Sequence, residues 1–330
     1  MTFFEKNSAH CFPQCVATGV VCFLFSLPVF SLETPKYPLK PLRIVVPFPP
    51  GGTADVVMRS ISRPLALALG QSVMIDNRPG ANTIIATQIV AHSPNDGYTL
   101  LSTGFPFISN AVFEKNLGFD TERDFSAVAR IESSPWILAI HPSLPALSIR
   151  ALVQLAKSRP GVLTYASNPR GSGAHLIGES LKKLAQVNLL DVPFQGETPA
   201  MVAVMSGQCD LLIAHIQPLI PQFNAHKLRA LAISSGQRLE QFPQLPTLQE
   251  SVMPRFELSG TQGLVVPAGT PSAVIERLSE EILRILNLPT IKNQMLREGL
   301  HLAPLNHEAY ASRIRKDIEN MRQMNTGSLF

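Results

Sequence analysis

The sequence predicts an α/β fold in which strands and helices alternate along the chain. The apolar run Leu42–Val46 is followed by a glycine turn and then by 54–69, where apolar residues recur every fourth position, as on one face of a helix. The same order recurs at 163–167, which precedes a turn-rich segment and a second periodic stretch at 175–184. Because this alternation is typical of strands joined by crossover helices, we expect largely parallel sheets.

Other segments extend the pattern. Pro64 falls inside the first helix, and we expect it to kink or break that helix because proline lacks the N–H that the helix needs. Ser148 is expected to cap a helix that runs through Ser158, and Thr198-Pro199 and Thr270-Pro271 are typical of further helix starts. A short helix is expected at 83–91. Further strands are expected at 71–76, 98–102, 137–140, 210–214 and 228–234.

Length and composition limit the class of protein. At 330 residues the chain can bury one large or two medium cores, and typical domain sizes favour two. With 45% apolar and 16% charged residues it is a globular sequence. The net charge of +4 is small and its basic residues are scattered, which argues against nucleic-acid binding and is compatible with a small anionic ligand.

The N-terminus has the pattern of an export signal. Lys6 is the only Lys or Arg among the first thirty residues, and 16–30 is almost wholly apolar. That length suits the apolar region of a signal peptide, and we expect cleavage near Ser31. A single N-terminal membrane anchor is the alternative, disfavoured by the missing basic flank. Cleavage would leave Cys209 as the sole cysteine, so the mature chain could form no internal disulfide.

Two glycine-containing loops stand at equivalent places. "PFPPGG" at 47–52 follows the first strand, and "NPRGSG" at 168–173 follows the strand at 163–167. Such loops lie at the carboxyl ends of parallel strands, where ligands usually bind. The following helix offers unpaired N–H groups, and glycine lets an anion approach them. Together the loops predict a clamp for carboxylates. Two ordinary connecting turns are the alternative, since Gly and Pro are common in such loops.

Patterns for other chemistries are missing. Neither loop is a Walker motif or a dinucleotide fingerprint, the histidines lack metal-ligand spacing, and there is no G-x-S-x-G elbow. We therefore expect no catalytic residues, no cofactor and no metal.

Seven motifs in one fixed order carry a resemblance to a known family. They are "YPLKPLRIVVPFPPGGTADVVMRSI", "MIDNRPGAN", "PNDGYTLL", "LTYASNPRGSGAHLIGESL", "VPFQGETPAM", "KLRALAIS" and "VVPAGTP". Together they resemble the Bug-type extracytoplasmic solute receptors, which are the substrate-binding subunits of tripartite tricarboxylate transporters. The resemblance runs from about Tyr37 to about Pro304.

The resemblance implies a two-lobed periplasmic binding protein of type II topology. It implies a cleft between the lobes that closes on a small mono- or dicarboxylate, a monomeric chain, and delivery of the ligand to membrane permease subunits. We expect a signal peptide at 1–31, one lobe from 37–136 and 255–330, and the other from 137–254. A signalling receptor on the same fold is the alternative partner class. A periplasmic enzyme acting on an anionic substrate is disfavoured, because no nucleophile–base pair is evident.

The resemblance also maps ligand-binding residues onto this chain. His215 departs from the family, which often carries Asp then Asn or Ser there, and Gln195 replaces a frequent Lys. Asp55 also has a simpler role as a favourable charge at a helix start, and packing is an alternative for His175, Phe48 and Phe194. The expected set is Phe48, Pro49, Pro50, Gly51, Gly52, Thr53, Asp55, Ser102, Thr103, Asn168, Gly171, Ser172, Gly173, Ala174, His175, Phe194, Gln195 and His215.

Overall fold

The computed structural model describes residues 37–168, 171–194, 196–298 and 300–326. The expected signal peptide and its cleavage site lie outside the described residues, as does Gln195. Residues 37–330 form one compact unit. In the described part of the chain, no helix combines the length and the apolar character that a membrane crossing requires.

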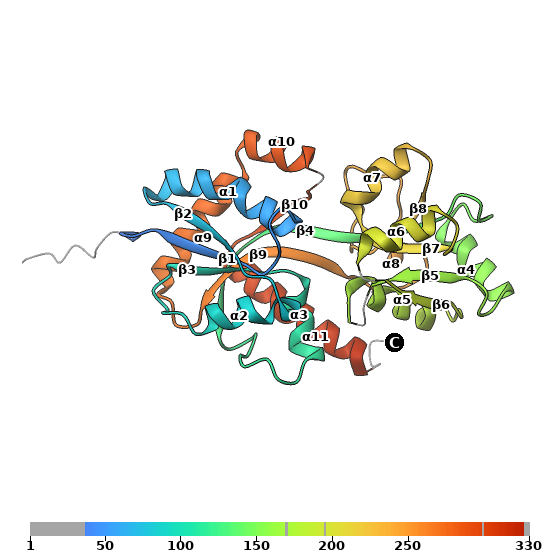
Figure 1. The fold of residues 1–330 in the computed structure, drawn as a ribbon, viewed down its shortest axis with the longest axis horizontal. Coiled ribbons are helices and arrows are strands. Elements are labelled where there is room, and N and C mark those ends of the chain that lie inside the picture. Colours follow the sequence, from blue (N-terminus) through green and yellow to red (C-terminus); the bar gives the residue numbers. More distant parts are fainter. Residues whose placement is uncertain (1–36, 169–170, 195, 299, 327–330) are drawn as a thin grey trace, which may run out of the picture. The chain divides into compact units, whose positions relative to one another are not determined.

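The first sheet is built around β1 (Leu42–Val46). This strand pairs in parallel with β2 (Val73–Asn77) and β3 (Thr99–Ser102), and β3 pairs antiparallel with β9 (Ser259–Pro267). Side chains of β1 alternate between two cores: Ile44 packs with α1 (Thr53–Leu69), and Val45 packs with α2 (Ile84–Ala91). The two helices accordingly cover opposite faces of the sheet (Figure 1).

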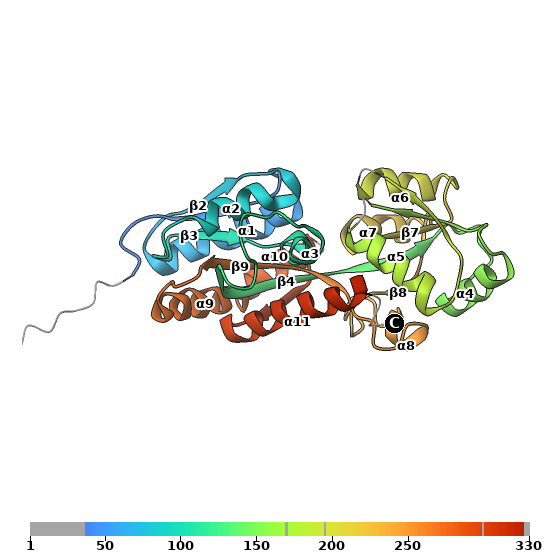
Figure 2. The same ribbon diagram turned by 90° about the horizontal axis from the view of Figure 1, so that it is seen from below.

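The second sheet contains β5 (Thr164–Ser167), which lies parallel to β6 (Leu190–Pro193) and β7 (Leu211–His215). The 16-residue strand β4 (Phe125–Ile140) belongs to both sheets. Up to Pro135 it pairs with β9, and from Trp136 it pairs with β7 and with β8 (Arg229–Ile233). Figure 2 shows β4 extending from beside β9 towards β8. A further short strand, β10 (Leu302–Leu305), also pairs with β4.

The expectation of largely parallel sheets is wrong. In the described residues, five of the nine strand pairings are antiparallel, and all five involve β4 or β9. These strands are apolar segments like the others, and an apolar run alone does not encode whether a strand pairs parallel or antiparallel. The prediction of 137–140 as a strand identified only the end of β4.

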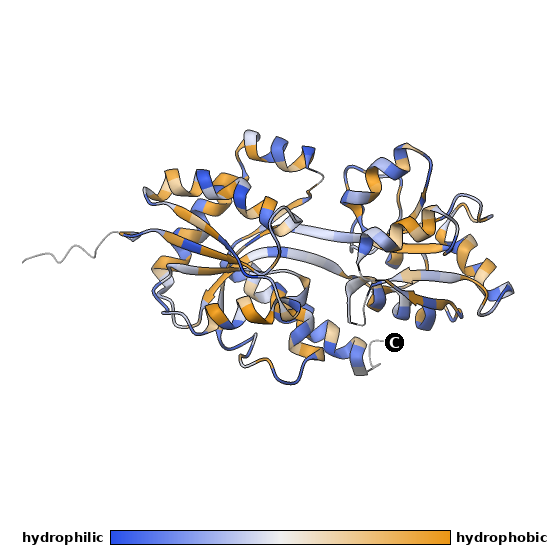
Figure 3. Cartoon of the chain, viewed as in Figure 1, coloured by the Kyte–Doolittle hydropathy of each residue, from blue (hydrophilic) through white to orange (hydrophobic). Residues whose placement is uncertain are grey.

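Helices flank both sheets, and their apolar stripes face the strands (Figure 3). The predicted cap at Ser148 is confirmed, since its side chain accepts a hydrogen bond from the Ala151 amide. Besides α1 and α2, the helices are α3 (Phe105–Phe113), α4 (Ile149–Ser158), α5 (Gly173–Leu184), α6 (Glu197–Met205), α7 (Ile216–Asn224), α8 (Leu248–Ser251), α9 (Ser272–Leu286), α10 (Pro289–Arg297) and α11 (His307–Thr326), with a short 3₁₀ turn at Ala81–Thr83.

Two predictions about prolines and caps in helices are corrected. Pro64 does not divide α1, which runs unbroken from Thr53 to Leu69. An interior proline costs about 3 kcal/mol, and this helix tolerates it because a full apolar face, including Ile61 and Leu65, is buried in the core. Helix α6 begins at Glu197 after Gly196, so Thr198 is not its cap, and Pro199 is tolerated because first-turn N–H groups have no helical partner.

Candidate functional site

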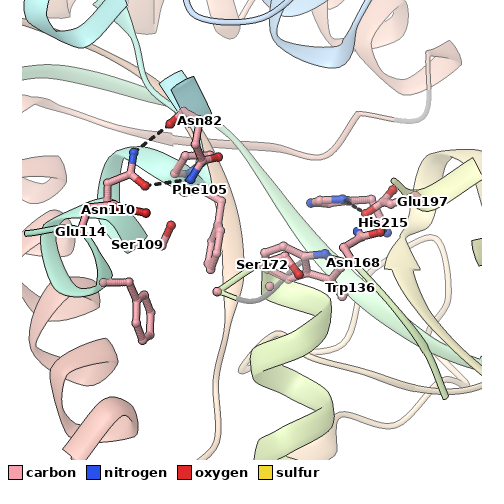
Figure 4. A pocket seen from close by; sticks show the side chains of 14 residues that line it. Asn82, Phe105, Ser109, Asn110, Glu114, Trp136, Asn168, Ser172, Glu197 and His215 are labelled. Atoms are coloured by element: carbon pink, nitrogen blue, oxygen red, sulfur yellow. Dashed lines mark hydrogen bonds and ion pairs between the residues drawn. The ribbon is translucent and has the colours of Figure 1, made fainter. Parts of the chain in front are cut away.

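Two adjoining cavities form the candidate site, with volumes of about 580 and 520 Å³. Both volumes are typical of small-molecule sites. Phe105, Pro106, Glu197 and His215 line both cavities, so the two are parts of one hollow. Figure 4 shows the first of them, which we call cavity A; the second is cavity B.

Five helices begin at these cavities. The lining includes first-turn residues of α1, α3, α5, α6 and α7, among them Thr53, Phe105, Gly173, Glu197 and Gln217. Each helix start carries a partial positive charge from its aligned peptide dipoles. The convergence therefore brings positive dipole ends to a hollow whose lining, among the described residues, contains no Lys or Arg.

Amide hydrogens are available at the start of α1, whereas a side chain caps the start of α5. The start of α1 follows Gly52, which has no side chain to cap it, and the amides of Thr53 and Ala54 have no acceptor within the described residues. In α5, the Ser172 hydroxyl accepts from the His175 amide at 3.3 Å. The first-turn N–H groups, which helix geometry leaves unpaired, are thus donors for an anion in the hollow.

Formal charges in the lining are few. Among the described residues the two cavities are lined by no Lys or Arg; Glu114 and Glu197 are the carboxylates and His215 the imidazole. Glu114 is exposed at the C-terminal end of α3, whereas Glu197 lies at the start of α6, where a negative charge is favourable.

His215 and Glu197 form an ion pair, with 2.6 Å between the imidazole Nδ1 and Oε1 (Figure 4). Burial acts to lower the pKa of His215, but the Glu197 carboxylate outweighs it and raises that pKa above its ordinary value. Burial conversely acts to raise the pKa of Glu197, and the charge and hydrogen bonds of His215 hold it below its ordinary value. The pair therefore favours a protonated imidazole whose Nε2–H has no partner among the described residues.

Aromatic side chains wall the hollow. Trp136 is buried, and its ring is tilted by 41° to that of His215, with ring centroids 4.5 Å apart. It meets Phe105 edge-on, with centroids 5.1 Å apart. A Cβ atom at Gly173 would lie 2.1 Å from the Trp136 ring, so that position of the second glycine loop requires glycine. A Cβ at Gly260 would lie 3.3 Å from Nε2 of His215.

Some buried polar atoms in the lining have no hydrogen-bond partner in the described residues. They are Oδ1 of Asn168 in cavity A, and Nε2 of Gln217 and Oε1 of Gln262 in cavity B. An unpaired buried donor or acceptor costs about 1–3 kcal/mol. Such groups are available to a bound molecule or to water, and they offer both donors and acceptors to it.

An unusual backbone segment also reaches the site. Ala81, Asn82 and Thr83 have φ values of 44°, 48° and 75°, three left-handed residues in a row with no glycine among them. Asn82 lines cavity A and exchanges hydrogen bonds of 2.8 Å with Asn110 of α3 (Figure 4). Strained segments of this kind cost about 1–3 kcal/mol per residue and concentrate at functional sites.

The lining contains many of the residues expected from the sequence, from both glycine loops. Other expected residues lie elsewhere: Ser102, Thr103 and Ala174 are buried in the fold, and Phe194 packs against a core. Pro50 is exposed. Those that line cavity A or B are Phe48, Pro49, Gly51, Gly52, Thr53, Asn168, Gly171, Ser172, Gly173 and His215.

Asp55 is held within its loop. Its carboxylate accepts from the Gly51 amide and from Arg59, each at 2.9 Å, and from Asn77 at 3.0 Å. The Arg59 hydrogen bond is the largest influence and lowers the pKa of Asp55 to about 2, against the smaller effect of burial. Asp55 thus fixes the shape of the first glycine loop.

Sequence reasoning missed several lining residues. Asn82, Asn110, Trp136 and Glu197 line cavity A but were assigned no ligand role. The motif "MIDNRPGAN" contains Asn82 and was a usable signal. Glu132 was also missed: it is fully buried behind the site, and the Ser134 hydroxyl, which lines cavity B, donates to its Oε1.

Comparison with known proteins identifies the family. The model of the tripartite tricarboxylate transporter family receptor matches residues 57–325. The chain belongs to this family. Its members are solute-binding receptors.

Individual relatives agree with this assignment. BugT of Bordetella pertussis is 34% identical over 267 residues, which are 80% of this chain and 81% of that protein. The structure of R. palustris Rpa4515 with adipate is 29% identical, with a TM-score of 0.74, and covers 88% of this chain and 97% of that one. The structure of the periplasmic binding protein BugD is 28% identical, with a TM-score of 0.72, over 88% of this chain and 98% of that one. The predicted family and two-lobed receptor fold are confirmed.

Proposed function

We propose that this receptor reversibly binds a small mono- or dicarboxylate in the joined cavities A and B and delivers it to the membrane permease of a tripartite tricarboxylate transporter. The convergence of five helix starts on one hollow is the observation that carries the proposal. Adipate bound to the similar protein Rpa4515 supports the same ligand class.

The carboxylate would be held mainly by backbone amides. Free N–H groups at the start of α1 point to one end of such a ligand, and Nε2–H of protonated His215 supplies a charge-assisted donor nearby. The orphan amide of Gln217 can donate, while the orphan oxygens of Asn168 and Gln262 can accept from ligand hydroxyls or bridging water. The expected ligand-binding residues that line the cavities are the core of this proposed site.

The residue bounds of the two lobes are part of the proposal. We infer one lobe from 37–136 and 255–330, and the other from 137–254. The change of partner along β4, from β9 before Trp136 to β7 after it, supports a boundary at that point. Closure about β4 and β9 would bring both glycine loops onto the ligand.

Export, monomeric state and absence of turnover belong to the same proposal. The family and the apolar stretch at 16–30 support a periplasmic chain cleaved near Ser31. The lining offers a His–Glu pair but no Ser, Cys or Lys within hydrogen-bond contact of that imidazole among the described residues. We therefore expect binding without chemical change.

The direct test is a thermal-shift and calorimetry screen of the mature chain. Adipate, malate and succinate are compared with adipamide, which keeps the carbon chain but removes both charges. A ligand at a hundred times its Kd adds about 2.7 kcal/mol of stability. Stabilisation by adipamide or neutral sugars, with none by any carboxylate, would refute the proposal. Recovery of the ligand unchanged after long incubation separates binding from turnover.

A further inference from the structure

A second cluster of ligating side chains lies outside the lining of cavities A and B. His175 and Glu179 are one turn apart on α5, and Asp191 lies on the neighbouring strand β6. One ligand atom from each of the three lies within 4.8 Å of the others, and all three side chains are partly buried.

The three groups are close without satisfying one another. Within the described residues, no hydrogen bond or ion pair joins any two of them, although each offers an atom within 4.8 Å of the other two. Nδ1 of His175 is buried and has no hydrogen-bond partner. A buried imidazole nitrogen without a hydrogen-bond partner is costly, so His175 has a ring nitrogen available to a ligand.

Neighbouring side chains orient both carboxylates. The Tyr165 hydroxyl donates to Oε1 of Glu179 at 2.8 Å, and the Ser167 hydroxyl donates to Oδ1 of Asp191. The Tyr165 hydroxyl also interacts with the Asp191 side chain, so it lies beside both carboxylates. Outer hydrogen bonds of this kind are typical of metal sites, because they fix the direction of the ligand lone pairs.

We propose that His175, Glu179 and Asp191 bind one divalent transition-metal ion, with Zn²⁺ as the reference case. One imidazole nitrogen and two carboxylate oxygens suit Zn²⁺, Mn²⁺ or Ni²⁺, whereas Ca²⁺ and Mg²⁺ prefer sites built wholly from oxygen. Zn²⁺ holds such ligands at about 2.0–2.2 Å. A small inward movement of the three side chains would complete that geometry.

The ion would join α5 to β6 behind the second glycine loop. His175 lies two residues after Gly173, which lines cavity A. A metal at this place therefore stiffens the first turn of α5 and leaves the cavity lining free. This role is independent of the proposed carboxylate binding.

Substitution of Lys182 tests whether a positive ion binds at this cluster. Its ammonium contacts Oε1 of Glu179 at 2.8 Å, on the oxygen that also accepts from Tyr165. A cation at that distance opposes a second positive ion. Lys182→Met should therefore strengthen metal binding, and Tyr165→Phe should weaken it by about 10- to 100-fold.

The experiment uses the full mature chain without a polyhistidine tag. After chelator treatment it is titrated with Zn²⁺ by calorimetry, and with Co²⁺ while the visible absorption of the bound ion is recorded. We expect one equivalent to bind and the melting temperature to rise. His175→Ala and Asp191→Asn should each abolish this uptake, and His92→Ala, at an exposed histidine of another helix end, should retain it.

Each outcome of the titration either supports the metal site or overturns it. Circular dichroism confirms that each variant is folded, and the conservative Asp191→Asn keeps the test valid if His175→Ala is unstable. No uptake by the folded wild type, or uptake that persists in both ligand variants, overturns the proposal. Carboxylate affinity is measured in parallel, so failure of the metal site is distinguishable from failure of the receptor function.

Discussion

At the residue scale, the His215–Glu197 pair decides how the site carries positive charge. A protonated His215 can donate to a ligand carboxylate, and binding should weaken as pH rises through the elevated pKa of this imidazole. Glu197→Gln removes the charge that raises this pKa, so the decline should move to lower pH. Titration calorimetry across pH 5 to 9 measures the shift.

The exposed Glu114 offers a matched control for that change. It lines the same cavity but makes no hydrogen bond to His215. Glu114→Gln should leave the midpoint of the pH profile unchanged. An identical profile in wild type and Glu197→Gln would contradict the assignment of His215 as the charged donor.

Glu132 should produce a measurable pH dependence of stability. Burial raises the pKa of its carboxyl to about 7, against the smaller opposing effects of Ser134, His215 and Arg130. The unfolded chain releases this proton near pH 4.5, so stability is highest below that value and is lost as pH rises towards 7, by on the order of 3 kcal/mol. Glu132→Gln should remove that loss and flatten the profile in urea unfolding measured from pH 4 to 8.

Asp55 should give the stability of the fold the opposite dependence on pH. Its pKa is lowered to about 2 by the Arg59 hydrogen bond first, so its contribution is present above pH 3.8 and is lost as pH falls towards 2. Asp55→Asn should lower stability at neutral pH, where Glu132→Gln raises it. A change of stability in the same direction in both variants would show that at least one of the two carboxyls lacks the environment described.

At the element scale, the glycine loops can be tested as binding surfaces. Gly51 has a φ of +83°, so a β-branched side chain there would strain the backbone. A loss of stability could then not be separated from a loss of ligand affinity. Gly52 has a φ of −78°, and a Cβ there would lie 3.5 Å from the Pro49 carbonyl oxygen, an ordinary contact. Gly52→Val should therefore reduce carboxylate affinity at least about tenfold, or 1.4 kcal/mol, with little change in melting temperature.

Gly70, at the other end of α1, supplies the control. Its φ is +70° and a Cβ would meet no atom within 4 Å, so Gly70→Ala costs stability without touching the site. Gly52→Val should thus lower the carboxylate affinity and leave the melting temperature nearly unchanged, whereas Gly70→Ala should do the reverse. Normal binding by Gly52→Val would mean that the first loop is only a turn.

The sequence predicted elements more reliably than their arrangement. Leu42–Val46 and the capped helix α4 were anticipated, because apolar periodicity and capping residues are local signals. The reversed direction of β4 and β9 was not, since an apolar run carries no information on its partner. Likewise, both glycine loops were found from local pattern, whereas Asn82, Asn110 and Trp136 meet only through long-range packing and the left-handed turn at 81–83.

At the scale of the whole molecule, the connectivity brings five helix starts to one hollow, and the proposed site would hold its ligand by helix dipoles more than by Lys or Arg side chains. Dipoles inside a cavity are screened by salt less than exposed Lys or Arg side chains are. The Kd for a carboxylate should therefore change by no more than about threefold between 50 and 500 mM salt, whereas surface ion pairs are largely screened over that range. Calorimetry in salt series of two different anions separates screening from direct competition for the site. A steep loss of affinity common to both series would show that a cationic side chain outside the described lining dominates ligand binding, and the convergence of helix starts would then be of secondary importance.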